Sequence, residues 1–491
     1  MTHGVVAKLR VLGLKGLLAE MASKNTPTTI AIDFSSPNIA KQFHIGNLRS
    51  TLIGRFTTTI QRVRGQRVHS VNYLGDWGTQ MAVITAYWPK VRPSGSFWFS
   101  ANDEVKIRLL TDCYVLAHRQ RLTDPELREQ ISQQILCMED SLCRGDKDDE
   151  SLRLWKEIYE VSERHLNHFY RAIRVEFDTW LRESEEVPAT RQLVEKLLVS
   201  GAVRRDELNR IVYPLSPDKY AVIQKSNAAS LYLTRDAVSL LRRDSLLGAS
   251  RYLYVVDRAQ KEHFEALRKV VAGVGREDLA ERIQHVSYGR VKGLSTRLGR
   301  TEAVSEILQS GREIAASWMA ESPTRRELDL NEKKAAETEL ALSSLVVSEL
   351  RRARNSDYEF SWRNAFSEKH SNALLLHSHH SRLCSIEQLN HNLLTLAQKS
   401  VLSEEEGASC LLSTLAALPD AVQESADRLE SHFMVNAILA LARESGRAAL
   451  ALRVKDQPEA VAGPRLALLS LTRRTLAEAM QLLSINPLTK M

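Results

Sequence analysis

The chain has 491 residues, 43% of them hydrophobic and 26% charged, which is the composition of an ordinary globular protein. This length is too great for one compact core, so two or three domains are expected. A formal charge of +7 permits a polyanionic partner without requiring one. No apolar run approaches the roughly 20 residues of a membrane-spanning helix. The cysteines are odd in number, five, and form no Cys-x-x-Cys pair, which argues against a disulfide framework or a zinc ribbon.

Residues 1–25 predict a helical lead-in that ends before Thr26-Pro27. Four basic residues stand there against a single acid, Glu20, with Val, Leu and Ala between them. Two interpretations remain open, a weak transit peptide and an ordinary basic amphipathic helix.

The next segment predicts a strand, a turn and a helix in close succession. Ile30, Ile32 and Phe34 alternate with small or polar residues, as in a strand. After Asn47, apolar residues recur at helical spacing until Gly65. A strand that turns into a helix through a glycine presents helix-end N–H groups, which bind phosphates well. This junction is where a doubly wound α/β domain binds its nucleotide.

The rest of the chain predicts a sheet with a helical insertion, followed by a helical region. A second strand is expected at 68–74, and a charged helical insertion at about 90–200. Strand-like signals return at 221–223, 231–233 and 252–256. Beyond Pro323 the period is almost wholly helical, and the last helix is expected to open at Gly463-Pro464 and to close before Pro487. The predicted architecture is therefore an α/β nucleotide fold followed by an all-α bundle.

The turn at 41–47 carries the candidate chemistry. His44 can donate to phosphate oxygens as negative charge builds on them, and Lys41 adds positive charge in the same turn. Gly46, which has no side chain, lets a purine ring approach the backbone. The alternative interpretation is a surface histidine in an ordinary β–α turn.

Several motifs in register resemble those of the class I arginyl-tRNA synthetases. They are the stretch from Asp33 to Thr51, Asn72-Tyr73-Leu74-Gly75-Asp76-Trp77-Gly78, Leu231-Tyr232-Leu233-Thr234-Arg235-Asp236, Tyr254-Val255-Val256-Asp257-Arg258-Ala259-Gln260, 285–297 and the terminal 485–491. The similarity covers nearly everything after residue 28.

The resemblance implies an arginine–tRNA ligase with a Rossmann-like class I catalytic domain. ATP and arginine would form arginyl-adenylate, and the arginyl group would then pass to the terminal ribose of tRNA-Arg. Magnesium would accompany ATP as a substrate, held mainly by phosphates, with no metal bound by the protein alone. The implied domains are a lead-in at 1–25, the catalytic domain at 26–320 and an α-helical anticodon-binding domain at 321–491. We expect a monomer that does not bind membranes, located in the mitochondrial matrix or alternatively in the cytoplasm.

Residue roles come from matching each motif. The resemblance assigns catalysis to His44, Lys41 and Arg297, and contact with ATP to His44, Gly46, Lys292 and Ser295. It assigns arginine binding to Ser36, Pro37, Asn38, Asn47, Tyr232, Asp236 and Gln260. A carboxylate with a phenol suits the guanidinium group, a planar and permanently charged fork. The alternatives are a core strand tyrosine for Tyr232 and a helix N-cap for Asp236.

The sequence departs from the family pattern at three places. Asn47 stands where the HIGH motif ends in histidine, and Asp33 where the family has glutamate. The KMSKS-like loop, Gly293-Leu294-Ser295-Thr296-Arg297, has no lysine at the usual place. Family members with such a loop compensate through the lysine that matches Lys41. These departures leave open a catalytically silent synthetase-like protein that binds RNA or a partner.

Two further features have alternatives. The family commonly carries another domain before the catalytic strand, and the first 27 residues are too few to form one, as in a compact organellar form or a truncated chain. His377, His379 and His380 with Cys384 could suggest a metal site, but a partly buried or tRNA-facing helix explains them better.

Overall fold

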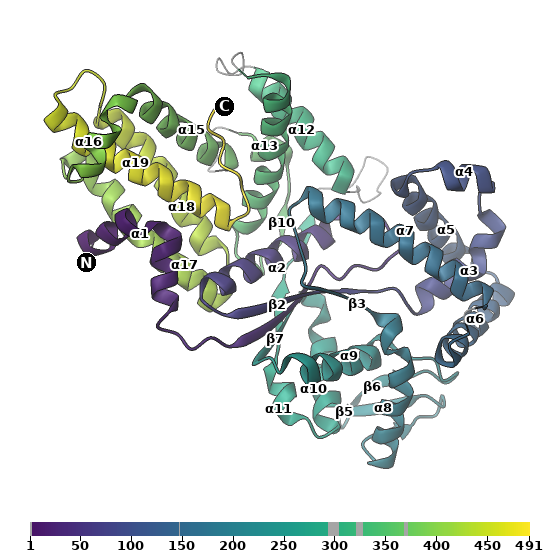
Figure 1. Cartoon of the computed structure of the whole chain (residues 1–491). Helices are drawn as coiled ribbons and strands as arrows, with labels where there is room; N and C mark the ends of the chain where they lie inside the picture. Colours follow the sequence, from purple (N-terminus) through teal and green to yellow (C-terminus); the bar gives the residue numbers. More distant parts are fainter. Residues whose placement is uncertain (1, 147, 293–303, 321–327, 368–371) are drawn as a thin grey trace. The chain divides into compact units, whose positions relative to one another are not determined.

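The computed structural model describes residues 2–146, 148–292, 304–320, 328–367 and 372–491. The chain forms two compact units (Figure 1). The catalytic unit comprises Thr28–Ser50 and Val68–Ser287, and the helical unit comprises Met1–Pro27, Thr51–Arg67 and Tyr288–Met491. The domain boundaries expected from the motifs, 1–25, 26–320 and 321–491, stay a prediction.

A five-stranded sheet forms the centre of the catalytic unit. Its strand order is β3-β2-β1-β7-β8. The strands are β1 (Thr29–Phe34), β2 (Arg67–Leu74), β3 (Thr179–Arg182), β7 (Arg251–Asp257) and β8 (Ile283–Tyr288). The first strand pairs in parallel with β7, and β2 pairs in parallel with β3. This is the doubly wound arrangement that the sequence predicts, with its topological switch point between β1 and β7.

Burial explains why the first strand and helix form where the pattern predicts them. Five of the six residues of β1 are buried, since helices cover both faces of such a sheet. The helix α2 (Ile45–Val63) follows and buries Leu48, Leu52 and Phe56. Its first residues belong to the catalytic unit, and its residues from Thr51 onward belong to the helical unit.

The helical insertion is shorter than expected. It lies between β2 and β3 and consists of α3 (Thr79–Val91), α4 (Gly95–Ser100), α5 (Asp103–Gln120), α6 (Pro125–Arg144) and α7 (Glu150–Ala172). The expected range of 90–200 was wrong at its far end, because Thr179–Arg182 is a strand of the main sheet. This strand is only four residues long and half-buried, so it gives too weak a period-2 pattern to stand out from its charged surroundings.

Two of the three later strand signals mark other structures. A separate antiparallel sheet holds β4 (Arg204–Arg205), β5 (Ile211–Ser216) and β6 (Lys219–Gln224), which includes 221–223. The prediction of a strand at 231–233 was wrong, because α9 (Tyr232–Leu247) begins there and Leu231 is its extended N-cap. A short apolar triplet at a helix start cannot be told from a strand by its period. The remaining catalytic-unit elements are η1 (Glu183–Glu186), α8 (Val187–Val199), η2 (Arg258–Gln260), α10 (Lys261–Gly273) and α11 (Glu277–Arg282).

The helical unit is a bundle with one small two-stranded sheet. Besides the part of α2 from Thr51 onward, the described helices of this unit are α1 (Thr2–Ala22), α12 (Val304–Ala320), α13 (Leu330–Leu350), α14 (Trp362–Ala365), α15 (Ala373–Leu389), α16 (Leu394–Lys399), α17 (Ser409–Arg428), α18 (His432–Ala451) and α19 (Glu459–Leu482), with short turns η4 (His391–Leu393) and η5 (Glu406–Ala408). The strands β9 (Val291–Lys292) and β10 (Tyr358–Glu359) pair in parallel. Among the described helices, none is both long enough and apolar enough to cross a bilayer.

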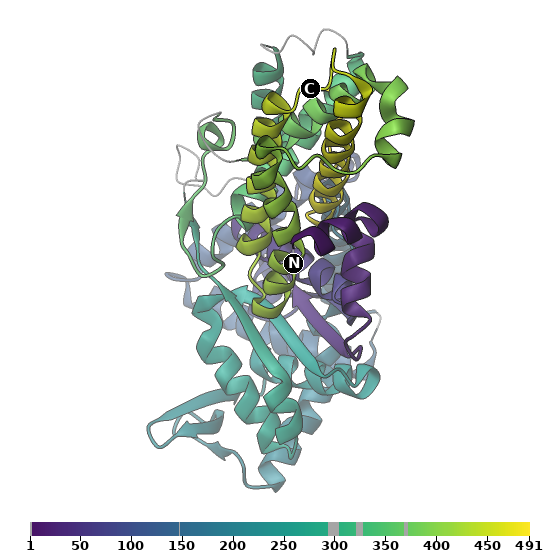
Figure 2. The same cartoon turned by 90° about the vertical axis from the view of Figure 1, so that its left-hand side faces the viewer.

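The lead-in helix α1 packs against α17 and α19 of the same unit (Figures 1 and 2). Leu9, Leu14 and Leu18 are fully buried there. Gly13 breaks the helix with a φ of 73°, which exposes two helix ends in mid-segment. Arg474 donates to the carbonyl of Leu9 at 2.6 Å, and Glu478 accepts from the backbone N–H of Leu14 at 2.6 Å. One turn of α19 therefore caps both halves of the kinked helix.

The start predicted for the last helix was wrong by several residues. The helix α19 begins at Glu459, and Pro464 lies inside it. Gly463 is needed for packing, because a Cβ there would lie 2.6 Å from Ser400 Oγ. The Gly463-Pro464 pair therefore marks a close contact in the first turns of the helix and not its start.

The histidines of α15 hold the C-terminal segment. His377 accepts from the backbone N–H of Leu488 at 3.3 Å and contacts Ser343 Oγ at 3.0 Å. His380 Nδ1 lies 2.9 Å from the carbonyl oxygen of Leu488. These contacts fit the interpretation of a partly buried helix.

Candidate active site

A pocket of about 570 Å³ opens in the catalytic unit beside the carboxyl ends of β1 and β7. Its walls come from β1, β2, α3, η1, α9, β7, η2 and α10 and from the turns after the strands. The lining residues are Asp33, Ser36, Asn38, Tyr73, Gly75, Trp77, Gly78, Thr79, Gln80, Glu183, Lys225, Ser230, Leu231, Tyr232, Arg235, Asp236, Tyr254, Val256, Gln260, His263 and Phe264. Ligands of open α/β sheets bind in this crevice, at the topological switch point.

The turn after β1 is strained and internally bonded. Ser35 and Ser36 have φ values of 66° and 40°, which non-glycine residues rarely adopt. The backbone N–H of Ser35 donates to Ser50 Oγ at 3.0 Å, and Ser50 in turn donates to the carbonyl of Val255 at 2.7 Å. These bonds hold the turn against β7. Residues kept in unfavourable conformations cluster at functional sites, where the surroundings enforce them.

Asp33 forms a buried ion pair at the base of the pocket. Arg243 donates to Asp33 Oδ2 at 2.8 Å, and Ser36 Oγ donates to Oδ1 at 2.6 Å. Arg243 also donates to Tyr254 at 3.0 Å. The side chains of Asp33 and Arg243 are 7% and 4% exposed, so removing either would leave an unpaired buried charge.

Asn38 lies at the pocket wall against a glycine. A Cβ on Gly75 would lie 2.1 Å from Asn38 Oδ1, so no side chain fits at that position. The backbone N–H of Gly75 donates to the carbonyl of Pro37 at 3.1 Å. The glycine of the Leu74-Gly75-Asp76 turn thus brings the end of β2 against the turn after β1.

Tyr232 and Asp236 lie one turn apart on α9 and both line the pocket. Asp236 Oδ2 lies 2.7 Å from His263 Nε2. The ring of Tyr232 stacks on His263, with centroids 4.7 Å apart and an interplanar angle of 30°. Burial and the charge of Asp236 raise the pKa of Tyr232, so the phenol keeps its proton. Within the described residues, Asp236 has no arginine or lysine within ion-pair distance.

Glu183 adds a third carboxyl to the pocket. Arg235 donates to Glu183 at 2.9 Å and to Ser230 Oγ at 2.8 Å. Burial raises the pKa of Glu183 to about 7; the charge of Arg235 opposes this rise and that of Asp236 adds to it. Near neutral pH, the carboxyl of Glu183 is therefore protonated in part of the molecules and ionised in the rest.

His44, Gly46 and Asn47 form a reciprocal cap at the start of α2. The backbone N–H of Gly46 donates to His44 Nδ1 at 3.1 Å, and that of His44 donates to Asn47 Oδ1 at 3.4 Å. Such a box satisfies two orphan N–H groups of a helix end. Because Nδ1 accepts a hydrogen bond, a neutral His44 carries its proton on Nε2. The surrounding protein atoms lower the pKa of His44, and the charge of Lys41 lowers it further, which favours this neutral form.

Lys41 precedes this cap. Its ammonium lies over the ring of Tyr114 from α5, 4.4 Å from the centroid. Partial burial lowers the pKa of Lys41. A cation held by an aromatic face is kept in place without a carboxylate to neutralise it.

The structure gathers most of the residues predicted to bind arginine. Ser36, Asn38, Tyr232, Asp236 and Gln260 line the one pocket. Pro37 and Asn47 are absent from the described lining, since Pro37 is buried behind the turn and Asn47 caps α2, and their contact with arginine stays a prediction.

Of the predicted ATP-contacting and catalytic residues near the KMSKS-like loop, the described part of the chain includes only Lys292. Lys292 is exposed on β9, within the helical unit. Ser295 and Arg297 lie outside the described residues, so the KMSKS-like loop stays a prediction.

Sequence reasoning missed Glu183 and His263. Glu183 directly follows β3, so recognising Thr179–Arg182 as a strand would have placed this acid at a carboxyl edge of the sheet. His263 follows Gln260 by three residues in α10, and this helical spacing was the available signal. No group of three or more His, Cys, Asp or Glu among the described residues is arranged to hold a metal ion.

Comparisons with known proteins agree with this geometry. Residues 10–362 match the family "tRNA synthetases class I (R), catalytic domain", and residues 376–491 match the "DALR anticodon binding domain". A Mus musculus protein named "Probable arginine--tRNA ligase, mitochondrial" is 29% identical over 500 residues, covering 100% of this chain and 83% of its own. A Dictyostelium discoideum protein named "Probable arginine--tRNA ligase, cytoplasmic" is 27% identical, covering 96% of this chain and 82% of its own.

The arginyl-tRNA synthetase of Plasmodium falciparum shares the fold, with a TM-score of 0.78 and 22% identity, covering 100% of this chain and 83% of that one. The catalytic family model covers well over half of the chain, and the anticodon-binding model covers most of the remaining residues. The chain therefore belongs to the class I arginyl-tRNA synthetases, a family of aminoacyl-tRNA ligases.

Proposed function

We propose that this chain is a catalytically active arginine–tRNA ligase and that Asp236 is the carboxylate that recognises the arginine side chain. The observation that supports this most strongly is the pairing of the pocket acids. Asp33 is paired with Arg243 and Glu183 with Arg235, whereas the hydrogen-bond partner of Asp236 is a histidine. A guanidinium group that enters the pocket therefore meets a carboxylate whose charge is not already matched.

The other pocket residues fit the rest of the amino acid. Tyr232 would accept a guanidinium N–H at its phenol oxygen, and Glu183 would add a second carboxyl. Ser36, Asn38 and Gln260 line the same pocket and offer polar groups to the α-amino and α-carboxylate groups of arginine. Pro37 and Asn47 would act by shaping the turn and the helix cap.

Adenylate formation needs the arginine carboxylate to attack the α-phosphorus of ATP as pyrophosphate leaves. His44 would donate from Nε2 to phosphate oxygens as negative charge builds on them, while Gly46 leaves room for the nucleotide at the start of α2. Lys41 would supply positive charge near the leaving pyrophosphate. Mg²⁺ would arrive with ATP, bound mainly by phosphate oxygens.

We further propose that Lys292, Ser295 and Arg297 contact ATP or the departing pyrophosphate from the degenerate KMSKS-like loop. The second step transfers the arginyl group from the adenylate to a ribose hydroxyl of tRNA-Arg, with AMP as leaving group. The catalytic domain would extend over 26–320 and the anticodon-binding domain over 321–491, and the latter would hold the anticodon stem and loop.

The compartment and the assembly belong to the proposal as well. The relatives named mitochondrial support a role in mitochondrial translation, with the cytoplasm as the alternative because cytoplasmic enzymes are also similar. We propose that the enzyme acts as a monomer.

ATP–pyrophosphate exchange with arginine, run with and without a tRNA-Arg transcript, tests the activity. We expect exchange that depends on the tRNA, and charging of the transcript with arginine but not with lysine. Folded protein that shows no exchange under either condition would favour the silent RNA- or partner-binding alternative.

A further inference from the structure

We propose that His263 is a positioning residue of the arginine pocket, acting as an uncharged donor that orients Asp236 and as a flat support for Tyr232. The inference rests on the proposed arginine-binding role of this pocket. His263 lies in the first turn of α10, a helix that follows η2 and packs beside α9.

One imidazole contacts both guanidinium-reading side chains. Its Nε2 lies 2.7 Å from Asp236 Oδ2, and its ring lies parallel to that of Tyr232 within 30°. The side chain of His263 is 8% exposed and that of Asp236 is 22% exposed, so the histidine lies deeper than the carboxylate that it supports. Tyr232 is 51% exposed, so the stacked imidazole covers part of a ring that otherwise faces solvent over half of its surface. A single substitution at His263 should therefore loosen both contacts with arginine.

The second ring nitrogen of His263, Nδ1, is buried and has no hydrogen-bond partner in the described part of the chain. Protonation would place an N–H donor at that atom, and a buried donor without an acceptor costs roughly 1–3 kcal/mol. The neutral ring must then carry its proton on Nε2 and donate it to Asp236.

The other titratable groups around the imidazole are already engaged or uncharged. Phe264 separates His263 from His285, with ring centroids 5.2 Å and 4.6 Å from the two imidazoles. The remaining titratable groups of the pocket are Asp33, Tyr73, Glu183, Lys225, Tyr232, Arg235 and Tyr254, with Arg243 behind Asp33.

An uncharged donor has a specific advantage beside this carboxylate. It fixes the rotamer of Asp236 without cancelling the negative charge that attracts the substrate. A lysine or arginine in its place would form an internal ion pair, which the guanidinium group of the substrate would have to displace. The pocket thus obtains an oriented acid that keeps its charge for the ligand.

Three substitutions separate the two contacts and the charge. His263→Gln keeps an uncharged N–H donor, His263→Phe keeps the ring under Tyr232 but has no donor, and His263→Lys keeps a donor but adds charge. Calorimetry of the full-length protein measures the dissociation constants for L-arginine and, separately, for ATP. We expect the arginine constant to rise less than about threefold for Gln, about tenfold for Phe and about a hundredfold for Lys. The ATP constant should stay within twofold of the wild-type value, on the order of experimental error, in all three.

Arginine affinity that is unchanged in all three variants would overturn the positioning role. So would equal losses for arginine and ATP, because a purely structural residue would weaken both. An equal effect of Gln and Lys would overturn the requirement for an uncharged donor. If the wild-type protein bound ATP but not arginine, the arginine pocket itself would be refuted, and this outcome differs from a failure confined to the variants.

Discussion

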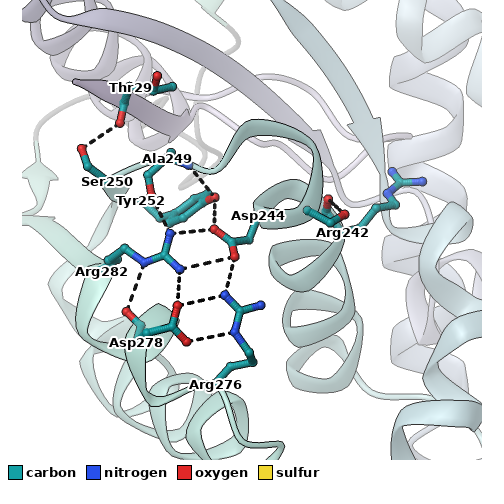
Figure 3. Close-up of polar contacts among 10 residues, drawn as sticks. Thr29, Arg242, Asp244, Ala249, Ser250, Tyr252, Arg276, Asp278 and Arg282 are labelled. Atoms are coloured by element: carbon teal, nitrogen blue, oxygen red, sulfur yellow. Dashed lines mark hydrogen bonds and ion pairs between the residues drawn. The ribbon is translucent and has the colours of Figure 1, made fainter. Parts of the chain in front are cut away.

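Two aspartates eight residues apart on α9 have opposite surroundings. Asp244 accepts hydrogen bonds from Tyr252 at 2.7 Å, from Arg282 at 2.8 Å and from Arg276 at 2.5 Å (Figure 3). Asp278 completes the network by accepting from both arginines. Asp236 has a histidine and an open pocket instead.

The difference separates a structural acid from a binding acid. Asp244 is saturated by two guanidinium groups of its own chain, so its charge contributes to folding and is unavailable to a ligand. Asp236 has the same chemistry on the same helix but keeps its charge for a guanidinium group from outside. Substitution of Asp236 should therefore weaken arginine binding, and substitution of Asp244 should lower the stability of the fold.

The largest effect is expected from Asp236→Ala. Truncating one partner of a hydrogen-bonded charge pair costs about 2–5 kcal/mol, which corresponds to a loss of arginine affinity of about 30-fold to several thousandfold. ATP–pyrophosphate exchange should show this loss in the arginine dependence, while ATP binding stays near that of the wild type. An arginine dependence like that of the wild type would rule out the guanidinium role of Asp236.

The matched substitution, Asp244→Ala, should affect stability and not binding. It would leave Arg276 and Arg282 without their shared carboxylate, at a cost of about 2–3 kcal/mol in the free energy of unfolding. This cost is below that of a fully buried pair because the two arginine side chains are 35% and 24% exposed. Urea unfolding measures the loss, and calorimetry of the folded fraction should give an unchanged arginine affinity. A variant that was fully stable but bound arginine weakly would reverse the comparison.

The pocket also shows what the sequence could and could not reveal. The motif identifies Tyr232 and Asp236 as site residues. The hydrophobic period wrongly predicts a strand at the first turn of α9, but a motif match does not depend on the secondary structure assigned to it. The acid run at Glu183 carried no motif and followed a strand too short to recognise. Its role in the pocket depends on Arg235, 52 residues away along the chain, a pairing that only the fold creates.

Helical periodicity was informative wherever packing was regular. The spacing of Leu48, Leu52 and Phe56 predicted α2 because all three face a core. It did not reveal the kink in α1, since Gly13 is one of several glycines and only the caps from Arg474 and Glu478 make a break there stable. Long-range polar contacts therefore account for the break in α1 and for the pairing of Glu183, two features that the pattern missed.

Glu183, which is paired with one arginine, is intermediate between Asp244 and Asp236, and we expect it to make arginine binding depend on pH. Its pKa of about 7 in the free pocket should fall when a guanidinium group binds beside it, so that binding releases a proton. Arginine affinity should then be constant above about pH 7 and fall below it, by at most about tenfold per pH unit. Calorimetry in buffers of different ionisation enthalpy measures the released proton. Glu183→Gln is the control and should remove the release; a persistent proton release in that variant would place the titrating group elsewhere.

The smallest effect concerns the acid stability contributed by Asp244. Burial alone would raise the pKa of this carboxyl, but hydrogen bonds from Arg276, Tyr252 and Arg282 hold it below the ordinary value. A lowered pKa in the folded state means that the folded protein releases this proton more readily than the unfolded chain. The stability from this group is therefore fully present above the unfolded pKa of about 4 and is lost as the pH falls through the lower folded value.

Urea midpoints at pH 5 and at pH 3 test this sign in the wild type and in Asp244→Asn. The amide carries no charge to pair with Arg276 and Arg282, so the variant should be less stable than the wild type at pH 5. Because the amide does not titrate, the variant should also lose less stability on acidification. Asp236→Asn is the matched control at the other end of the helix. Since Asp236 has no arginine or lysine within ion-pair distance in the described part of the chain, its replacement should change the acid dependence less than that of Asp244. A flattening in Asp236→Asn as large as that in Asp244→Asn would mean that both carboxylates contribute equally to acid stability, and the distinction between the two aspartates would then be one of degree.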